Sequence, residues 1–356
     1  MRKTKILLAM SGGTDSSAAA VMLNEQGYDV QGLFISFFNS NWASPQVIAQ
    51  QQESLNTVAE VCSALSIPFH HVDASQKFYT TVIEYFVQEY LAARTPFPCA
   101  ICNPRLKWQI LYDYSIDLQC DCIATGHYVS IEKRNDLYYI SQGIDPDKDQ
   151  SFFLWGLAQH ILSRTIFPLG SFTKKQVREY AYNKGFTTIS QRKDSLGICF
   201  LGNSNYRPFL VQELAKRNIT IPRGNHINEQ GEIIAPNEGY TWYTVGQRKQ
   251  LGIALNTRLF VKCINAQDNT VTLSPYISLF RTQFIVHSYY FHSPTDMQGD
   301  LTVKIRYRNQ EHSCNITDIR EKTCTVQLHT PLEAIAPGQT AVFYKETRVV
   351  GGGFIQ

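Results

Sequence analysis

Long apolar runs and a secretion signal are both missing from this chain. No uninterrupted apolar stretch approaches the roughly 20 residues that cross a bilayer. The first residues pass almost directly into a strand-like run and leave no room for a signal peptide. The nine cysteines are odd in number and scattered, which excludes a secreted disulfide framework and favours reduced, catalytic or ligating thiols. We therefore expect a cytoplasmic protein without a membrane partner.

A strong charge of one sign is missing as well. The 33 Lys and Arg residues nearly balance the 30 Asp and Glu residues, which leaves a net charge of +3. This balance permits a nucleic-acid partner but does not indicate one. There is no repeat and no low-complexity tract. With 356 residues, 44% of them hydrophobic, the chain is expected to fold into two or three domains, each with its own core.

The most informative segment is a glycine turn near the N-terminus. Residues 6–19, ILLAMSGGTDSSAA, are typical of a strand, a tight turn and the start of a helix. The adjacent Gly12 and Gly13 allow backbone N–H groups to approach a ligand, and the helix N-terminus favours an anion. Asp15 is placed to hold the magnesium ion that accompanies a polyphosphate.

This turn differs from the common phosphate-binding loop. No Gly-Lys-Ser or Gly-Lys-Thr closes it, so the Walker A motif is absent. Ser-Gly-Gly-x-Asp-Ser is instead the signature of the ATP-pyrophosphatase loop, in which the backbone grips pyrophosphate and ATP is split to AMP. The alternative is an ordinary turn capped by Asp15. The preceding strand, the following helix and the flanking serines favour a nucleotide site that adenylates a substrate.

The first half of the chain alternates strands and helices. We expect strands over residues 5–10, 30–38, 68–72 and 122–124, and helices over residues 16–26, 45–65, 76–93, 105–118 and 173–184. Such alternation predicts a doubly wound parallel sheet that binds ligands beyond the carboxyl ends of its strands. Two prolines, Pro96 and Pro98, are expected to prevent helix formation and keep the segment before residue 105 irregular.

The second half is predicted to be rich in β-structure. From about residue 207 helical periodicity fades, and short β-rich runs separated by Asn, Asp, Gly and Pro follow. We expect a hairpin over residues 259–264 and 270–273, and a small antiparallel barrel or sandwich over residues 301–308, 314–319, 324–329 and 341–344. The sequence thus predicts an α/β protein with a doubly wound parallel-sheet domain (1–205), a small β-rich central domain (206–275) and a C-terminal antiparallel β-barrel (276–356).

Three cysteines lie in segments suited to chemistry. Cys99 and Cys102 follow the two prolines, and Cys199 lies in the glycine-bracketed stretch 193–202. A thiolate attacks sulfane sulfur and activated carbons, but the spacing alone leaves open a redox pair, half a metal site or no role. The other six have apolar or strand-like neighbours and are expected to be small buried side chains: Cys62, Cys120, Cys122, Cys263, Cys314 and Cys324.

Ordered motifs along nearly the whole chain resemble those of the tRNA-specific 2-thiouridylases, a family of the ATP-pyrophosphatase-loop superfamily. They are SGGTDSS at 11–17, CNPRLKW at 102–108, ATGHY at 124–128, KDQSFFLW at 148–155, GICFLG at 197–202, YTVGQRKQLGI at 243–253, KIRYR at 304–308, APGQTAVFY at 336–344 and GGGFI at 351–355. The resemblance implies an enzyme that replaces the C2 oxygen of the anticodon wobble uridine with sulfur, and a tRNA-contacting barrel.

The resemblance also implies roles for particular residues. ATP and magnesium would be held by Ala9, Met10, Ser11, Gly12, Gly13, Thr14, Asp15 and Ser16, with Ile35 and Gly126 lining the adenosine. Cys199 would receive sulfane sulfur from a persulfide donor, either a cysteine desulfurase or a sulfur relay protein. Cys102 would resolve that persulfide and leave a disulfide for a reductant to reopen. Adenylation of the uridine C2 oxygen would make AMP the leaving group.

The remaining motifs are predicted to contact tRNA, and no DNA partner is implied. The residues are His127, Lys148, Asp149, Gln150, Arg306, Tyr307 and Gln339, and the target base would lie in a pocket formed by Phe97, Pro98 and Cys99. Each contact has an alternative. His127 could be a structural histidine, Asp149 a helix cap, Arg306 and Tyr307 part of a solvated strand face, and Gln339 part of a plain turn.

Two positions depart from the family pattern T-P-N-P-D-x-x-C-N. Phe97 replaces the asparagine and Cys99 replaces the aspartate. In one hypothesis Cys99 is a tolerated replacement or a third redox thiol, and persulfide chemistry proceeds at Cys199 and Cys102. In the other, all three cysteines ligate a [4Fe-4S] cluster whose fourth iron carries a sulfide.

Two functions of other classes remain open. An ATP-dependent ligase or amidotransferase would explain the glycine turn but would leave Cys102, Cys199 and the β-rich half without a purpose. A tRNA-binding protein without catalysis is the third hypothesis, which the altered loop makes more plausible.

Overall fold

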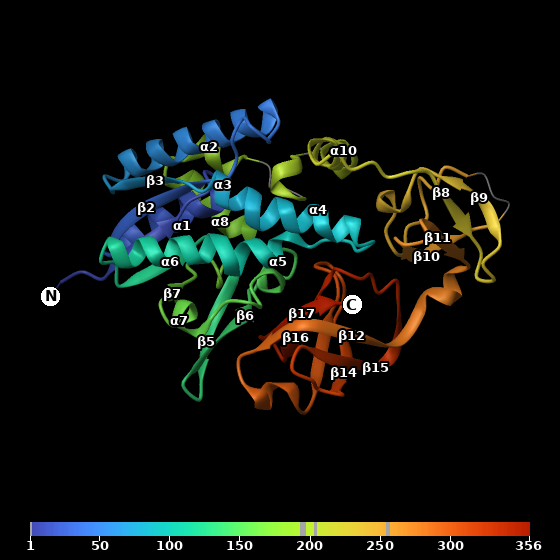
Figure 1. Cartoon of the computed structure of the whole chain (residues 1–356). Coiled ribbons are helices and arrows are strands. Elements are labelled where there is room, and N and C mark those ends of the chain that lie inside the picture. The colour runs from blue at the N-terminus through green and yellow to red at the C-terminus, as the bar shows by residue number, and fades with distance from the viewer. Residues whose placement is uncertain (1, 193–196, 203–204, 254–256) are drawn as a thin grey trace. The chain divides into compact units, whose positions relative to one another are not determined.

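The computed structural model describes residues 2–192, 197–202, 205–253 and 257–356 (Figure 1). Residues 193–196, which the sequence joins to the Cys199 motif, lie outside this description. The chain divides into two compact units, and each consists of several segments. The first unit contains Met1–Val82, Cys99–Ser204 and Thr347–Val350, and the second contains Ile83–Pro98, Asn205–Glu346 and Gly351–Gln356.

A five-stranded parallel sheet forms the centre of the first unit. Its strands are β1 (Lys5–Ala9), β2 (Asp29–Ser36), β3 (Phe69–Asp73), β4 (Cys122–Thr125) and β7 (Thr165–Ile166). The order is β3-β2-β1-β4-β7, and every neighbouring pair is parallel. The chain therefore adds β2 and β3 on one side of β1 and then β4 and β7 on its other side, which creates a switch point between β1 and β4. The predicted doubly wound sheet is confirmed.

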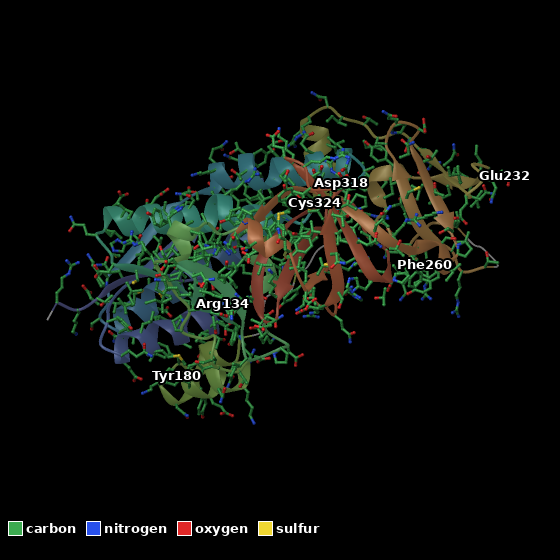
Figure 2. All side chains as sticks on the ribbon, turned by 90° about the horizontal axis from the view of Figure 1, so that it is seen from below. Arg134, Tyr180, Glu232, Phe260, Asp318 and Cys324 are labelled. Carbon is green, nitrogen blue, oxygen red and sulfur yellow. The ribbon has the colours of Figure 1, made fainter. Side chains whose placement is uncertain are left out.

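Helices cover the sheet and bury its apolar strands. They are α1 (Thr14–Glu25), α2 (Pro45–Ala64), α3 (Ser75–Phe78), α6 (Trp108–Asp117), α7 (Gln159–Leu162), α8 (Lys174–Asn183) and α9 (Thr187–Ser190). Ile6 and Leu8 of β1 share a core with Met22 of α1 and Val177 of α8. Because residues i and i+2 of a strand lie on one face, this alternation directs β1 toward those helices. Figure 2 labels Tyr180 on α8, whose hydroxyl donates to Glu25 Oε2 of α1 at 2.6 Å.

The expectation of an irregular segment before residue 105 holds for residues 94–97 but is wrong for the residues from Pro98 onward. Helix α5 (Pro98–Cys102) continues through a π-helical turn (Asn103–Lys107) into α6. Pro98 occupies the first position of the run, where its missing N–H has no helical partner to lose. Pro104 falls in the π-turn, where the hydrogen-bonding pattern of the helix is already altered. A second π-turn, Tyr79–Ile83, interrupts the helix predicted over residues 76–93.

The first unit also contains a hairpin that was not predicted from the sequence. Strands β5 (Val129–Arg134) and β6 (Leu137–Gln142), labelled in Figure 1, pair antiparallel, and Ser141 of β6 pairs in turn with Arg348. The turn between them uses Asn135 and Asp136, with φ of 47° and 65°. Asparagine and aspartate adopt these positive φ values more readily than most residues do, so Asn-Asp was the available signal.

The second unit contains two helices and a small mixed sheet. The helices are α4 (Glu84–Leu91) and α10 (Tyr206–Lys216), and the sheet order is β10-β11-β8-β9, with strands Phe260–Asn265, Thr270–Ser274, Gly224–Ile227 and Ile233–Asn237. The predicted hairpin is confirmed as β10 and β11. Helix α10 corrects the expectation that helices end near residue 207. Its signals are the Asn205 cap and the buried Leu210 and Leu214 at helical spacing.

A closed antiparallel barrel completes the second unit. Its six strands are β12 (Phe280–Phe291), β13 (Leu301–Lys304), β14 (His312–Thr317), β15 (Thr323–Glu333), β16 (Thr340–Lys345) and β17 (Arg348–Ile355). Pairing of β12 with β17 closes the ring, which confirms the barrel prediction. The strand predicted over 301–308 ends at Lys304, and the residues after it form a turn. Buried Cys324, labelled in Figure 2, lies on β15.

Smaller features complete the description. Short 3-10 helices cover Ser151–Phe153, Cys199–Leu201, Tyr240–Trp242, Tyr276–Leu279 and Pro294–Met297. The prediction that six cysteines are buried holds for Cys62, Cys120, Cys314 and Cys324. Cys122 is only partly buried, and the prediction is wrong for Cys263, which is exposed on β10. Within the described residues, no helix has the length and apolar character that crossing a membrane requires.

Candidate active site

The glycine turn after β1 is shaped by one obligatory glycine. Gly12 has a φ of +74°, and a Cβ there would lie 2.6 Å from the Ser54 carbonyl oxygen. Gly13 is extended, with a φ of −88°, and caps α1. The Ser11 N–H donates to Ser16 Oγ at 3.1 Å, which folds the turn over the start of the helix. Backbone N–H groups at this end of α1 thus border the space beyond β1, as anion binding requires.

Gly126, which follows β4, lies directly against the same helix start. A Cβ on Gly126 would be 2.8 Å from the Ser16 nitrogen and 2.9 Å from the Asp15 carbonyl carbon. Since β1 and β4 are neighbours at the switch point, glycine at this position allows the two strand ends to come together. The sequence named Gly126 for this place, and the structure brings it to the nucleotide turn.

One cavity, with a volume of about 430 Å³, joins the glycine turn to the catalytic cysteines that the sequence proposed. Its lining includes Ala9, Met10, Ser11, Asp15, Ser16, Ile35 and Gly126 from the predicted ATP site, together with Cys102, His127, Gln150 and Cys199. Thr14 instead turns to the protein, where its hydroxyl donates to the Ile189 carbonyl at 2.6 Å. The cavity therefore holds the two halves of the proposed chemistry in one place.

Asp15 is held by two residues that the sequence analysis did not name. Lys174 Nζ donates to both Asp15 carboxylate oxygens at 2.8 Å, and the Tyr128 hydroxyl donates to Oδ1 at 2.6 Å. Lys174 is the first residue of α8, whose Thr173 forms a capping box with Gln176. The capping box fixes the start of the helix and therefore the place where the ammonium group emerges. Its Thr-x-x-Gln pattern was the only local signal for this residue.

The three cysteines lie close enough to interact electrostatically. Cys99 and Cys102 are three residues apart on one helical run, so they share a face, and Cys199 begins a 3-10 helix. Burial raises the pKa of Cys102 to about 11 and that of Cys199 to about 12, with the neighbouring thiols adding to both shifts. Burial also raises the pKa of Cys99. Cys199 nevertheless stays accessible, because its side chain faces the cavity.

Lys107 opposes these shifts and was missed by the sequence analysis. Its positive charge lowers the pKa of each of the three thiols, and it lines the same cavity. In a π-turn, residues i and i+5 are hydrogen-bonded neighbours, so the turn places Lys107 one turn beyond Cys102. An ordinary α-helix would rotate position 107 away from Cys102, so secondary-structure expectations alone could not have found it.

The cysteines do not form a site for a single metal ion. Across the described ranges, no three His, Cys, Asp or Glu side chains are gathered closely enough to hold one. All nine cysteines are free thiols, so Cys102 and Cys199 are not joined. A four-iron cluster spreads its cysteine ligands farther apart than one ion does, so the donor set of three thiols still suits such a cluster chemically.

His127 and the motif after β6 sit in the same unit. The His127 Nδ1 lies 2.7 Å from Thr125 Oγ1, and burial together with Lys107 lowers the pKa of the ring to about 3. Gln150 Oε1 accepts from the Tyr128 N–H at 3.0 Å. Buried Asp149 accepts from the N–H groups of Gly143 and Ser151, but the N-cap of the following 3-10 helix is Gln150, so Asp149 is not the predicted helix cap. The half-buried Lys148 lies beside it, and a tRNA contact by these residues stays a prediction.

The other predicted contacts belong to the second unit. Arg306 and Tyr307 lie in the turn after β13, where the Arg306 guanidinium donates to the Ala334 carbonyl at 2.8 Å. Gln339 Nε2 donates to the carbonyls of Thr95 and Pro96 at 3.0 and 3.2 Å. The Phe97 N–H faces the Tyr85 hydroxyl at 3.5 Å, and Pro98 starts α5.

Comparison with known families gives three adjacent matches. The profile of the tRNA methyl transferase HUP domain matches residues 4–203, that of the tRNA methyl transferase PRC-barrel domain matches residues 209–275, and that of the aminomethyltransferase β-barrel domain matches residues 281–355. The first of these covers more than half of the chain. The three matches agree with the predicted order of a parallel-sheet domain, a central β-rich domain and a C-terminal barrel.

Curated relatives match over their full length. The tRNA-specific 2-thiouridylase MnmA 2 of Phocaeicola vulgatus is 44% identical, with 100% of both chains covered. The tRNA-specific 2-thiouridylase MnmA 1 of Bacteroides fragilis is 42% identical and covers 100% of this chain and 98% of its own. A solved 4-thiouridine synthetase–RNA complex with bound ATP is 17% identical, covers 60% of this chain and 50% of its own, and has a TM-score of 0.35, too weak to bear on function. The resemblance seen in the motifs is confirmed, and this chain belongs to the tRNA-specific 2-thiouridylase family.

Proposed function

We propose that this chain is a tRNA uridine 2-sulfurtransferase. It uses ATP to activate the C2 oxygen of the anticodon wobble uridine, replaces that oxygen with sulfur and releases AMP and pyrophosphate. The observation that carries the proposal is the single cavity lined by the glycine turn, Cys102 and Cys199. Adenylation of the C2 oxygen and sulfur attack on C2 take place at neighbouring atoms of one base, so an enzyme of this kind needs both groups within reach of that base.

The ATP step is assigned to the turn after β1. Backbone N–H groups at the start of α1 would bind pyrophosphate, and Ile35 and Gly126 would border the adenosine. Asp15 supplies the carboxylate that magnesium needs, and Lys174 and Tyr128 fix its orientation. Magnesium would neutralise the phosphates when bound. Lys174 would then be free to exchange Asp15 for a phosphate oxygen.

The sulfur step is assigned to Cys199 and Cys102. A persulfide-carrying donor protein would load Cys199, and the terminal sulfur would attack C2 as the bond from C2 to the AMP-bearing oxygen breaks. The Cys102 thiolate would then attack Cys199 Sγ, leaving the transferred sulfur on C2 and a Cys102–Cys199 disulfide for a thiol reductant to reopen. Lys107, with its charge directed at these thiols, favours the anionic sulfur that both attacks require.

A cluster route to the same product is the second hypothesis, and the proximity of Cys99 to the other two thiols favours it. Cys99, Cys102 and Cys199 would hold three irons of a [4Fe-4S] cluster, which would supply an iron-bound sulfide. In the persulfide route Cys99 is a tolerated replacement or a third redox thiol, whereas the cluster uses all three thiols as ligands.

The function is tested with the full-length chain, unmodified tRNA, magnesium, ATP and a persulfide donor. We expect AMP formation that depends on tRNA, and 2-thiouridine in the digested product. Cys199→Ser abolishes 2-thiouridine, whereas Cys263→Ser, which changes an exposed cysteine on β10, leaves it unchanged. AMP formation driven by a small carboxylate or amine without tRNA would favour a ligase, and tRNA binding without either product would favour a non-catalytic protein.

The two sulfur routes are separated by iron and acid-labile sulfide in protein purified without oxygen. The cluster route predicts near-stoichiometric iron and sulfide, and loss of both cluster and thiolation in Cys99→Ala. The persulfide route predicts no iron, with thiolation retained in Cys99→Ala.

A further inference from the structure

The loop that leads into α5 is poor in backbone donors. Residues 95–98 read Thr-Pro-Phe-Pro, and neither proline has an N–H group. The Thr95 N–H donates to the Pro337 carbonyl at 2.8 Å, and the Phe97 N–H faces the Tyr85 hydroxyl. The loop carbonyls therefore need donors from another part of the chain.

Gln339 supplies those donors from the barrel. Its Nε2 donates to two consecutive carbonyls, Thr95 at 3.0 Å and Pro96 at 3.2 Å. All of these residues belong to the second unit. One side-chain amide thus holds the backbone immediately before Phe97, the first residue of the proposed target-base pocket.

The neighbouring glycine allows this close approach. Gly338 has a φ of +86°, and a Cβ there would lie 2.7 Å from the Thr95 carbonyl oxygen and 2.9 Å from Arg94 Cβ. Arg94 is itself fixed, because its guanidinium pairs with the buried Glu89 carboxylate at 2.8 Å. The turn Pro337-Gly338-Gln339 (the barrel turn) and the loop are therefore in direct backbone contact.

The barrel turn is rigid in its own right. The Gly338 N–H donates to the Ile355 carbonyl at 2.8 Å, and the Ile355 N–H donates to the Gln339 carbonyl at the same distance. Since Ile355 ends β17, the turn is attached to the last barrel strand on one side and to the loop on the other. The last barrel strand therefore fixes where the barrel turn lies, and the barrel turn fixes where the loop backbone lies.

We infer that Gln339 is a positioning residue that holds residues 95–97 in the conformation in which Phe97 and Pro98 receive the target base. In the free chain its amide nitrogen donates to this loop. The effect of Gln339 on catalysis rests on the proposed function. The claim that Gln339 holds the loop does not depend on that function. The barrel then contributes to the reaction by ordering the base pocket as well as by any contact with RNA.

The test replaces the amide with a carboxylate of the same shape. Gln339→Glu keeps the size and removes both donated bonds, and Gln283→Glu makes the same charge change on the exposed face of β12. In the free protein, we expect hydrogen exchange of a peptide covering residues 92–98 to become about tenfold faster in Gln339→Glu. Gln283→Glu leaves that exchange unchanged.

Enzyme kinetics and binding supply the second measurement. Gln339→Glu should lower kcat for 2-thiouridine formation roughly three- to tenfold while the tRNA Kd and the KM for ATP stay within about twofold of the wild type. Weaker tRNA binding with unchanged exchange of residues 92–98 would overturn the inference and assign Gln339 to RNA contact. If the wild-type protein forms no 2-thiouridine but residues 92–98 still exchange faster in Gln339→Glu, the proposed function is contradicted and the positioning role of Gln339 is kept.

Discussion

At the scale of single residues, the site depends on glycines, whose lack of a Cβ allows backbone segments to come close, as well as on charged side chains. Gly12, Gly126 and Gly338 each lie where a Cβ would come within 3 Å of a neighbouring backbone atom. At each position a missing side chain lets two backbone segments approach, and at Gly126 this approach joins β4 to the nucleotide turn. Lys107 and Lys174 then supply positive charge, the first near three thiols and the second on Asp15.

The two glycines of the turn should differ in their tolerance of alanine. Gly12→Ala should lower the free energy of unfolding by about 1–3 kcal/mol from its positive φ alone, with the overlap on Ser54 adding to it. Gly13→Ala has an ordinary φ and meets only Ser11 Oγ at 3.6 Å, so its stability should stay close to that of the wild type. Urea unfolding without nucleotide measures both, and equal losses would contradict the assigned turn geometry.

His127 should make stability depend on pH. Its pKa is lowered from 6.5 to about 3 in the folded chain, so below pH 6.5 the unfolded chain binds a proton that the folded chain does not. The free energy of unfolding should therefore fall as the pH drops from 6.5 toward 3. His127→Gln removes this contribution and should flatten the dependence of the urea midpoint on pH. The exposed His329→Gln is the control, and identical slopes in all three proteins would refute the prediction.

At the scale of elements, helix ends and irregular turns place the functional groups. The capping box of α8 fixes where Lys174 emerges, and the π-turn after α5 brings Lys107 back over Cys102. In the second unit, α10 is attached to α4 by charge, because Arg217 Nη1 lies 2.6 Å from the fully buried Glu213 carboxylate and Nη2 lies 2.6 Å from Glu84. The capping box, the π-turn and Arg217 all lie at helix ends, where backbone groups lack intrahelical partners.

Removal of Arg217 should therefore destabilise the chain strongly. Arg217→Met leaves buried Glu213 with Lys216 as its remaining charged partner and should cost about 3 kcal/mol in the free energy of unfolding, measured in urea. Arg223→Met, at an exposed position, should cost little. Adding Glu213→Leu to Arg217→Met should restore part of the loss, since the buried carboxylate that lost its Arg217 partner is then removed as well. A double variant as unstable as the single one would contradict this account.

At the scale of the whole molecule, neither unit is one continuous segment. Ile83–Pro98 belongs to the second unit, and Thr347–Val350 belongs to the first. Within the second unit, Tyr90 of α4 stacks on Tyr206 of α10 with ring centroids 4.5 Å apart. The loop after α4 is in turn bound by the barrel turn. The helix that precedes the cysteines is thus built into the fold of the β-rich half.

This discontinuity predicts how fragments behave. A chain of residues 205–356 alone lacks α4 and should unfold at a clearly lower temperature, by circular dichroism, than a fusion that restores residues 83–98 through a flexible linker. The lost contacts include the stacked Tyr90 and the Gln339 bonds to the loop. An equal melting temperature for the two proteins would show that the segment adds nothing to the unit.

The sequence by itself determined the features that short stretches of chain encode. A tight turn at Gly12 and Gly13, alternation of strands and helices, and the order of the family motifs depend on neighbouring residues, so the parallel sheet, the closed barrel and the family were predictable. The irregular segment was predicted to continue too far, because proline in a first helical turn costs little and α5 begins at Pro98. Only the tertiary structure decided that Cys102, Cys199 and the glycine turn share one cavity, that Lys174 holds Asp15 and that Gln339 braces a distant loop. Those contacts join residues far apart in the chain, and their approach is set by how whole elements pack, which local propensities do not specify.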